Sequence, residues 1–114
     1  MIFDVLIIGG GAAGMSCALV LGSAKKSPVA SEKSIGIVLH QRSSAMENAI
    51  FYNVLGLKPG TTGKDILESG MAQLTDTYPH VIQIKNEKVL LVQGEKNNFT
   101  VGTNKNTYQA KIVV

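Results

Sequence analysis

The sequence has little of several residue types, and each scarcity excludes a class of protein. Its single cysteine, Cys17, excludes an internal disulfide and a zinc site built on several cysteines. It has no tryptophan, three tyrosines, three phenylalanines and a net charge of only +3, a composition that argues against a nucleic-acid-binding surface. With 45% hydrophobic residues and three prolines, its 114 residues suffice for one folded domain or a part of one.

A long uninterrupted apolar run is also missing. The most apolar stretch, residues 5–22, is broken by a cluster of glycines, and Asp4 stands where a signal peptide has basic residues. The apolar part before the glycines has only the length of a strand. We therefore expect no signal peptide, no membrane span, no membrane or nucleic-acid partner and a cytoplasmic location.

What the sequence does have is a glycine-rich turn between a predicted strand and a predicted helix. The strand covers residues 2–8 and is apolar on both faces, as in a buried parallel strand. The helix begins at residue 11 or 12 and ends near residue 25. In this context a G-x-G-x-x-G motif predicts a dinucleotide site. Its candidate cofactor-binding residues are Gly9, Gly10, Gly11, Ala12, Ala13 and Gly14.

Each spaced glycine of the motif has a physical role. Gly9 permits the sharp turn, Gly11 leaves room for a pyrophosphate to approach the backbone, and Gly14 lets the helix pack closely on the strand. The start of the helix offers unpaired N–H groups and the positive end of its dipole to the phosphates. The alternative is a turn that only packs a strand against a helix and binds nothing.

A second apolar strand, residues 35–39, follows a polar loop at residues 27–34 and completes a β-α-β unit. A dinucleotide site usually has Asp or Glu at the end of this strand, where the carboxylate binds the ribose hydroxyls. This chain has His40, Gln41 and Arg42 instead. His40 or Gln41 can hydrogen-bond a hydroxyl, and Arg42 can meet a 2′-phosphate. The alternative is that His40 is only a polar residue that caps the end of the strand.

The middle of the chain predicts a helical turn within residues 45–51 and a loop at residues 53–63, rich in glycine and proline. Apolar residues at helical spacing then predict an amphipathic helix from residue 64 or 65 to about residue 77. Thr62 or Gly63 would cap this helix. Its apolar stripe is interpreted as core packing.

After this helix the hydrophobic period changes to that of strands, separated by polar turns. The last strand is apolar on both faces, as expected of a strand that returns to the centre of the sheet. We expect His80 to lie at the surface and Cys17 to be a buried packing residue. The predicted strands are residues 81–84, 88–92, 99–103 and 107–114. The sequence thus predicts an α/β, Rossmann-like dinucleotide-binding fold with a parallel sheet, flanking helices and an antiparallel β-meander.

In this order, the motifs resemble the N-terminal flavin-binding part of the thioredoxin reductase-like FAD-dependent pyridine-nucleotide oxidoreductases. Residues 3–14 are similar to the opening of that family, with Ala12 where many members have proline. Asn53 and Gly56 resemble the ends of an Asn-Phe-Pro-Gly stretch that runs beside the flavin. Residues 60–66 are similar to the start of the family's next helix.

The last third of the chain also resembles this family. Val89 and Val92 look like its paired valines, the first of which meets the adenine with its backbone. Residues 99–103 and 108–114 are similar to the meander that follows. From this resemblance we name Asn53 and Val89 as further cofactor-binding residues.

The resemblance implies that residues 1–114 are the N-terminal portion of an FAD-binding domain, without an NAD(P)H domain. It implies a part of a longer FAD-dependent oxidoreductase, inactive by itself. FAD would be the cofactor and NAD(P)H the co-substrate whose hydride the flavin accepts, so no side chain is named as catalytic and no metal is expected. The electron acceptor and the oligomeric state stay open, with a homodimer as one option. The alternatives are an NAD(P)-binding dehydrogenase domain and a non-catalytic nucleotide-binding regulatory module.

Overall fold

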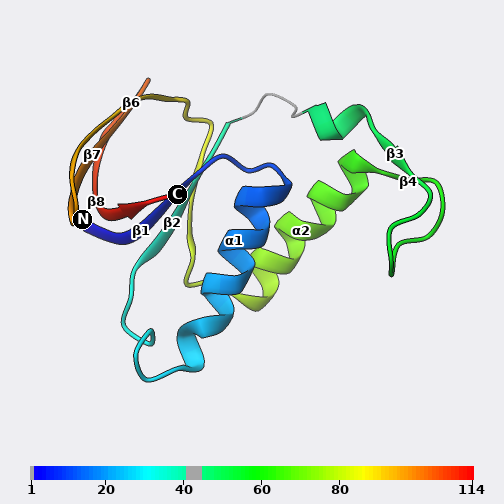
Figure 1. Ribbon diagram of the computed structural model, residues 1–114, viewed down its shortest axis with the longest axis horizontal. Helices are drawn as coiled ribbons and strands as arrows, with labels where there is room; N and C mark the ends of the chain where they lie inside the picture. Colours follow the sequence, from blue (N-terminus) through cyan, green and yellow to red (C-terminus); the bar gives the residue numbers. More distant parts are fainter. Residues whose placement is uncertain (1, 41–44) are drawn as a thin grey trace.

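The computed structural model describes residues 2–40 and 45–114 of the chain. A sheet lies beside two long helices, and a small hairpin extends from the N-terminal end of the second helix (Figure 1). The elements in chain order are β1 (Ile2–Ile8), α1 (Ala12–Ser23), the 3-10 turn η1 (Ala24–Lys26), β2 (Ile35–Leu39), the 3-10 turn η2 (Ala45–Asn48), β3 (Ile50–Phe51), β4 (Thr61–Thr62), α2 (Gly63–Thr77), β5 (Ile82–Lys85), β6 (Val89–Glu95), β7 (Asn98–Thr103) and β8 (Thr107–Val113).

Within the described residues, the main sheet has the strand order β5-β2-β1-β8-β7-β6. The strands β5, β2, β1 and β8 run parallel, and β8, β7 and β6 form an antiparallel meander. β1 lies between β2 and β8, with Val5 opposite both Ile35 and Ile112. Because β2 and β1 are parallel neighbours, their carboxyl ends meet at one edge of the sheet, where ligands of open α/β sheets bind.

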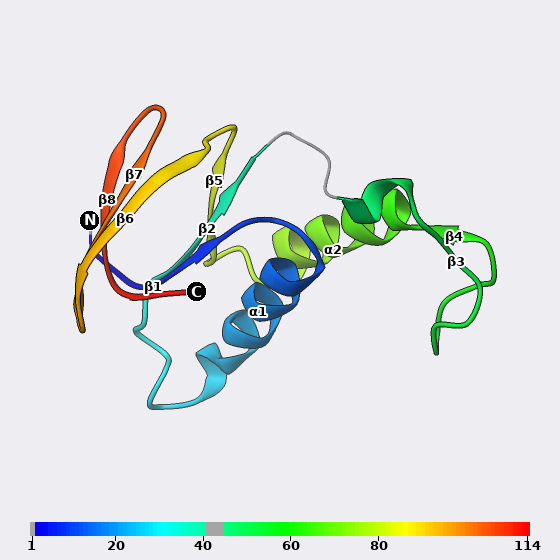
Figure 2. The same cartoon turned by 45° about the horizontal axis from the view of Figure 1, so that its top comes forward.

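The two faces of the parallel strands are covered by different elements. Figures 1 and 2 show α1 and α2 side by side on one face, whereas the meander curves away from the helices. On the helix side, Ile7 and Ile37 pack with Met15, Ala18 and Leu74, all buried. Cys17 packs against this core as expected, although it is only partly buried.

The meander closes a second core on the other side of the parallel strands. There Phe3, Leu6 and Val38 pack with Val101 and Ala110 of the meander. Three layers follow: helices, parallel strands and meander. The predicted α/β class with a meander is confirmed, and the boundaries of β1 and β2 agree with the prediction.

Two segments differ from the prediction. The expected loop at residues 53–63 ends in a strand, because Ile50 and Phe51 pair antiparallel with Thr62 and Thr61. The expected helical turn is correspondingly confined to η2. His80 is half-buried rather than at the surface, because its ring packs edge-on against Tyr78, with ring centroids 6.1 Å apart.

Candidate functional site

The glycine turn leaves β1 through a backbone conformation that side chains disfavour. Gly9 has φ +101°, in the left-handed region where a Cβ is strained. The N–H of Gly9 donates to the carbonyl of Val38 at 3.0 Å, so the turn begins while still joined to β2. The sharp turn predicted at Gly9 is thus present, and it lies at the carboxyl edge of β1 and β2.

The other glycines of the turn divide into packed and open positions. A Cβ at Gly14 would overlap the carbonyl oxygen of Gly9, which explains the close approach of α1 to the turn. A Cβ at Gly10 would lie 2.5 Å from the side chain of Leu39. A Cβ at Gly11 would meet no atom of the described residues within 4 Å. Gly11 therefore borders open space, the feature that a pyrophosphate approaching the backbone needs.

The start of α1 is the part of the turn where backbone N–H groups lie. Gly11 is its N-cap in extended conformation, and among the described residues no side chain caps its N–H groups. The first turn holds no acidic residue, and Ala12 and Ala13 are exposed. Because the first N–H groups of a helix lack partners within the helix, these amides point a positive dipole end at the open space beside Gly11.

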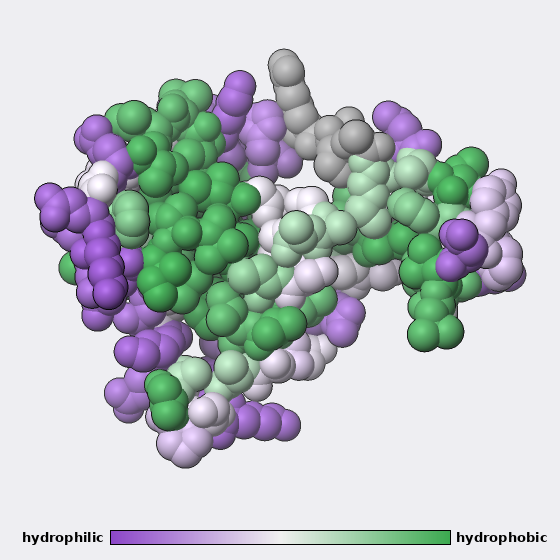
Figure 3. All heavy atoms as spheres, in the orientation of Figure 1, coloured by the Kyte–Doolittle hydropathy of each residue, from purple (hydrophilic) through white to green (hydrophobic). Residues whose placement is uncertain are grey.

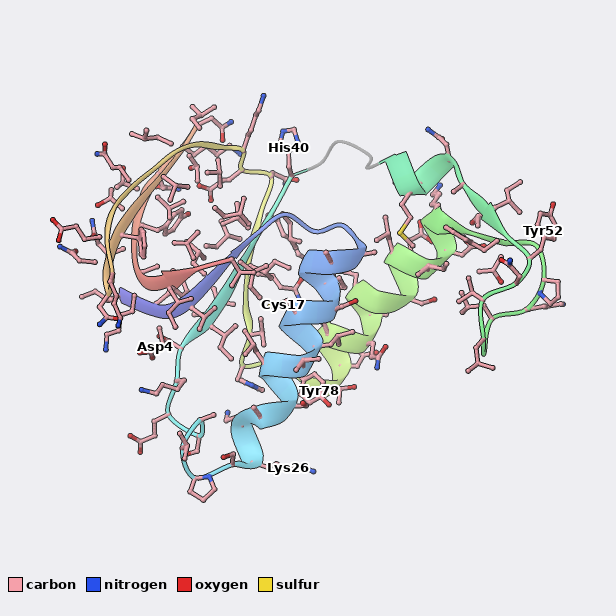
Figure 4. The ribbon with its side chains drawn as sticks, viewed as in Figure 1. Asp4, Cys17, Lys26, His40, Tyr52 and Tyr78 are labelled. Atoms are coloured by element: carbon pink, nitrogen blue, oxygen red, sulfur yellow. The ribbon has the colours of Figure 1, made fainter. Side chains whose placement is uncertain are left out.

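The end of β2 lies beside this turn, as the sequence predicts. His40 follows β2 directly, and its side chain is exposed (Figure 4). The contact of Leu39 with Gly10 places His40 at the same edge of the sheet as the glycine turn. Gln41 and Arg42, the other two candidates here, lie outside the described residues.

Asn53 lies apart from the glycine turn. It is exposed in the loop between β3 and β4, next to Tyr52, and both views show this hairpin extending beyond the start of α2, away from the sheet (Figures 2 and 4). The hairpin exposes the apolar residues Ile50, Val54 and Leu55. The space-filling view shows an apolar group at this end of the molecule, separate from the larger one over the strands (Figure 3). The predicted contact of Asn53 with a flavin stays a prediction.

Val89 lies at the same edge as His40. It begins β6, is half-buried, and pairs with Thr103 of β7. The turn before it is joined to β2, because the N–H of Glu87 donates to the carbonyl of Leu39 at 3.3 Å. The structure therefore brings together the ends of β1, β2 and β5 and the start of β6.

Sequence reasoning missed Glu87, which is buried within this edge at 6% exposure. The hydrogen bond from the Thr103 hydroxyl, aided by those from Tyr108 and Asn106, holds the pKa of Glu87 below its ordinary value in spite of its burial. No sequence signal marks this carboxylate, because Glu87 stands between Asn86 and Lys88 in what looks like a plain polar turn.

A separate groove of about 300 Å³ runs between α1 and α2 and under the loop before β4. Ala12, Met15 and Leu19 line it from α1, and Ile66 and Gly70 from α2. Its lining is mostly apolar, so it offers little to a phosphate. The open space at Gly11, beside the N–H groups at the start of α1, has the chemistry that suits an anion better. Among the described helices, none is long and apolar enough to cross a membrane.

Comparison with known proteins gives matches among solved structures alone. No protein-family model matches the chain, and no curated protein matches it. The chain is similar to an oxidoreductase from Agrobacterium tumefaciens, with 27% identity and a TM-score of 0.81 over 99% of this chain and 35% of that one. It is also similar to the thioredoxin reductase of T. acidophilum, with 25% identity and a TM-score of 0.75 over 98% and 34%.

A thioredoxin reductase from Streptococcus pyogenes has the same fold, with 24% identity and a TM-score of 0.74 over 98% of this chain and 34% of that one. The chain thus spans about a third of the length of the structures that it matches. The resemblance to thioredoxin reductase-like FAD oxidoreductases, inferred from the sequence, is confirmed in fold.

Proposed function

We propose that this chain, which has the fold of thioredoxin reductase-like FAD oxidoreductases, binds the ADP half of FAD as part of a flavin-dependent oxidoreductase. The observation that carries the proposal is the turn at residues 9–14. Its left-handed Gly9, the open space at Gly11 and the uncapped start of α1 together form a cradle for a pyrophosphate.

The residues at this edge of the sheet fit the ADP half of FAD. The backbone N–H groups of Ala12 and Ala13 would hold the pyrophosphate, since both residues are exposed and lie at the positive end of α1. His40 would meet the adenosine ribose in place of the usual carboxylate, with an imidazole N–H as donor. Val89 would lie next to the adenine, and Asn53 beside the flavin. Bound flavin supplies the redox chemistry and would accept hydride from NAD(P)H.

The meander favours FAD over a dinucleotide-binding dehydrogenase domain. A simple Rossmann domain continues its parallel sheet with further β-α units. Here β6, β7 and β8 form an antiparallel meander instead, and only β8 returns to the parallel strands. The alternative of a regulatory nucleotide-binding module rests on His40, which stands where a ribose-binding carboxylate is usual.

The test is whether the purified chain retains flavin. It is incubated with FAD, passed over a gel-filtration column, and its visible spectrum is recorded. The proposal predicts a yellow protein fraction. A colourless fraction at every FAD concentration, with a folded chain by circular dichroism, contradicts it. Anaerobic addition of NADH or NADPH to the protein that carries this chain then tests the hydride step, because reduction bleaches the flavin absorbance.

A further inference from the structure

A buried carboxylate joins two turns at the edge of the sheet. Glu87, in the turn between β5 and β6, accepts hydrogen bonds from three residues of the β7–β8 region. Its Oε1 accepts from the Thr103 hydroxyl at 2.6 Å and from the Asn106 amide at 3.3 Å. The Tyr108 hydroxyl lies 2.9 Å from Oε1 and 2.7 Å from Oε2. The side chains that bind the carboxylate therefore come from the end of β7, the start of β8 and the turn between them.

Backbone and amide contacts strengthen this junction. The N–H of Lys88 donates to the side-chain oxygen of Asn104 at 2.9 Å, and the N–H of Asn104 donates back to the carbonyl of Lys88 at 3.0 Å. Asn86 has φ +63°, so the chain reverses sharply just before Glu87. The turn of residues 86–88 is thus fixed in position and orientation by the β7–β8 turn.

The same turn lies where a nucleobase is expected. A dinucleotide seated on the glycine turn has its ribose at the end of β2. Beyond β2, on the side away from β1, comes β5, and the turn of residues 86–88 follows the carboxyl end of β5. The hydrogen bond from the N–H of Glu87 to the carbonyl of Leu39 holds this turn next to the end of β2. The base of a bound nucleotide would therefore meet the backbone of this turn.

A buried carboxylate is a costly way to gain stability alone. Its desolvation offsets much of what its hydrogen bonds contribute, and apolar replacements of buried charges are often neutral or stabilising. What several directional hydrogen bonds to one carboxylate do provide is a defined position for the group that carries it.

We propose that Glu87 is a positioning residue for base recognition: it fixes the turn of residues 86–88 as the platform against which the adenine of the ligand lies. The inference rests on the proposed function, because it places a base next to a phosphate cradle. It adds that selectivity for adenine depends on Glu87, although this side chain is buried and turned toward the β7–β8 turn.

The test compares two nucleotides that differ only in the base. ADP and UDP share ribose and pyrophosphate, so the ratio of their dissociation constants measures base recognition. The wild-type chain is expected to prefer ADP. Glu87→Gln keeps the volume of the side chain and removes its charge. It should weaken ADP binding about tenfold, while UDP binding changes less than about twofold.

The matched control is Glu95→Gln, at an exposed residue of β6, which should leave the ratio unchanged. Tyr108→Phe provides a second variant: it removes the donor to Oε2 and keeps the edge-on packing against Phe3. It should reduce the preference for ADP even if Glu87→Gln does not fold. Thermal melts establish that each variant is folded.

The outcomes separate this inference from the proposed function. A wild-type chain that binds neither nucleotide overturns both. A wild-type chain that binds ADP and UDP equally well overturns the inference alone. So does a folded Glu87→Gln or Tyr108→Phe chain that keeps the wild-type ratio, or one that loses affinity for both nucleotides to the same degree.

Discussion

The α-carbon of Gly14 packs against the carbonyl oxygen of Gly9, at the point where α1 passes the end of β1. A Cβ on Gly14 would overlap this oxygen, which belongs to the backbone and has little freedom to move. Gly14→Ala should therefore destabilise the chain by about 1–3 kcal/mol, as overpacking does in a close-packed interior. A lowered midpoint in thermal unfolding, with a normal midpoint for Gly102→Ala on β7, checks this. Equal unfolding midpoints for Gly14→Ala and the wild-type chain would contradict the close contact between Gly14 and the carbonyl oxygen of Gly9.

A second prediction concerns Asp4 and acid. The backbone N–H of Ser34 donates to Oδ2 of Asp4 at 2.8 Å and lowers the pKa of this carboxyl, with help from the Ser34 hydroxyl and from Lys111. Because the folded-state pKa is depressed, this stabilisation is present above the ordinary pKa of an aspartate and is lost as the pH falls through the lower, folded value. Asp4→Asn should lower the free energy of unfolding at pH 7. On acidification, the free energy of unfolding of this variant should fall less than that of the wild-type chain.

Urea unfolding at pH 7 and at about pH 3 measures this difference, since ordinary carboxyl groups titrate near pH 4. Asp76→Asn, at an exposed residue of α2, is the control and should keep the wild-type pH dependence. Some acid sensitivity should remain in Asp4→Asn, because the pKa of Glu87 is also lowered. If Asp4→Asn lost as much stability between pH 7 and about pH 3 as the wild-type chain does, the charge of Asp4 would not be coupled to folding.

His80 should make the stability of the fold depend on pH in a different range. Burial lowers the pKa of His80 and the positive charge of Lys25 adds to this, whereas the carbonyl of Gly22 acts in the opposite sense. The unfolded chain therefore takes up a proton at a higher pH than the folded chain, so stability should fall as the pH drops through about 6.5. The buried Nε2 of His80 has no partner among the described residues, which agrees with a neutral ring.

The variant His80→Gln should flatten the dependence of stability on pH between about 7.5 and 5.5, the range in which an ordinary histidine titrates. His40→Gln is the matched control, because the side chain of His40 is exposed at the end of β2. Unfolding midpoints across this range measure both variants. An unchanged slope in His80→Gln would rule out His80 as the source.

The next prediction tests the position of the ribose. His40 stands where a carboxylate usually binds the ribose hydroxyls, and it lies at the edge that carries the glycine turn. His40→Glu should tighten the binding of ADP, by up to about tenfold for one well-placed charged hydrogen bond. Calorimetric titration of both chains measures this. Equal affinities would place the ribose contact elsewhere.

Much of the fold could be predicted from the sequence, because its main signals are local. The apolar runs of β1 and β2, broken by glycine and by a polar loop, defined both strands to the residue. The spacing of Leu67, Met71 and Leu74 defined α2, and the Thr62 cap is present, with its hydroxyl accepting from the N–H of Asp65 at 3.1 Å.

The features that escaped prediction depend on contacts between distant residues. β3 and β4 are two residues each and form only because they pair across a loop, so neither has a periodic pattern of its own. Glu87 meets Thr103 and Tyr108 only once the meander has folded. The same holds for His80, whose burial depends on Gly22 and Tyr78. In the candidate site, the glycine turn could be predicted from the sequence. The hydrogen bonds of Glu87 to Thr103, Asn106 and Tyr108 could not.

The most direct test of the central claim is an ADP titration of the wild-type chain and of Gly11→Val. A Cβ at Gly11 would meet no described atom within 4 Å, so we expect the variant to fold normally and its side chain to fill the space proposed for the pyrophosphate. We predict saturable ADP binding by the wild-type chain and by Gly102→Ala, and at least a tenfold loss in Gly11→Val with an unchanged unfolding midpoint. A wild-type chain that does not bind ADP, or a Gly11→Val chain that binds it equally well, would contradict a phosphate site at this turn.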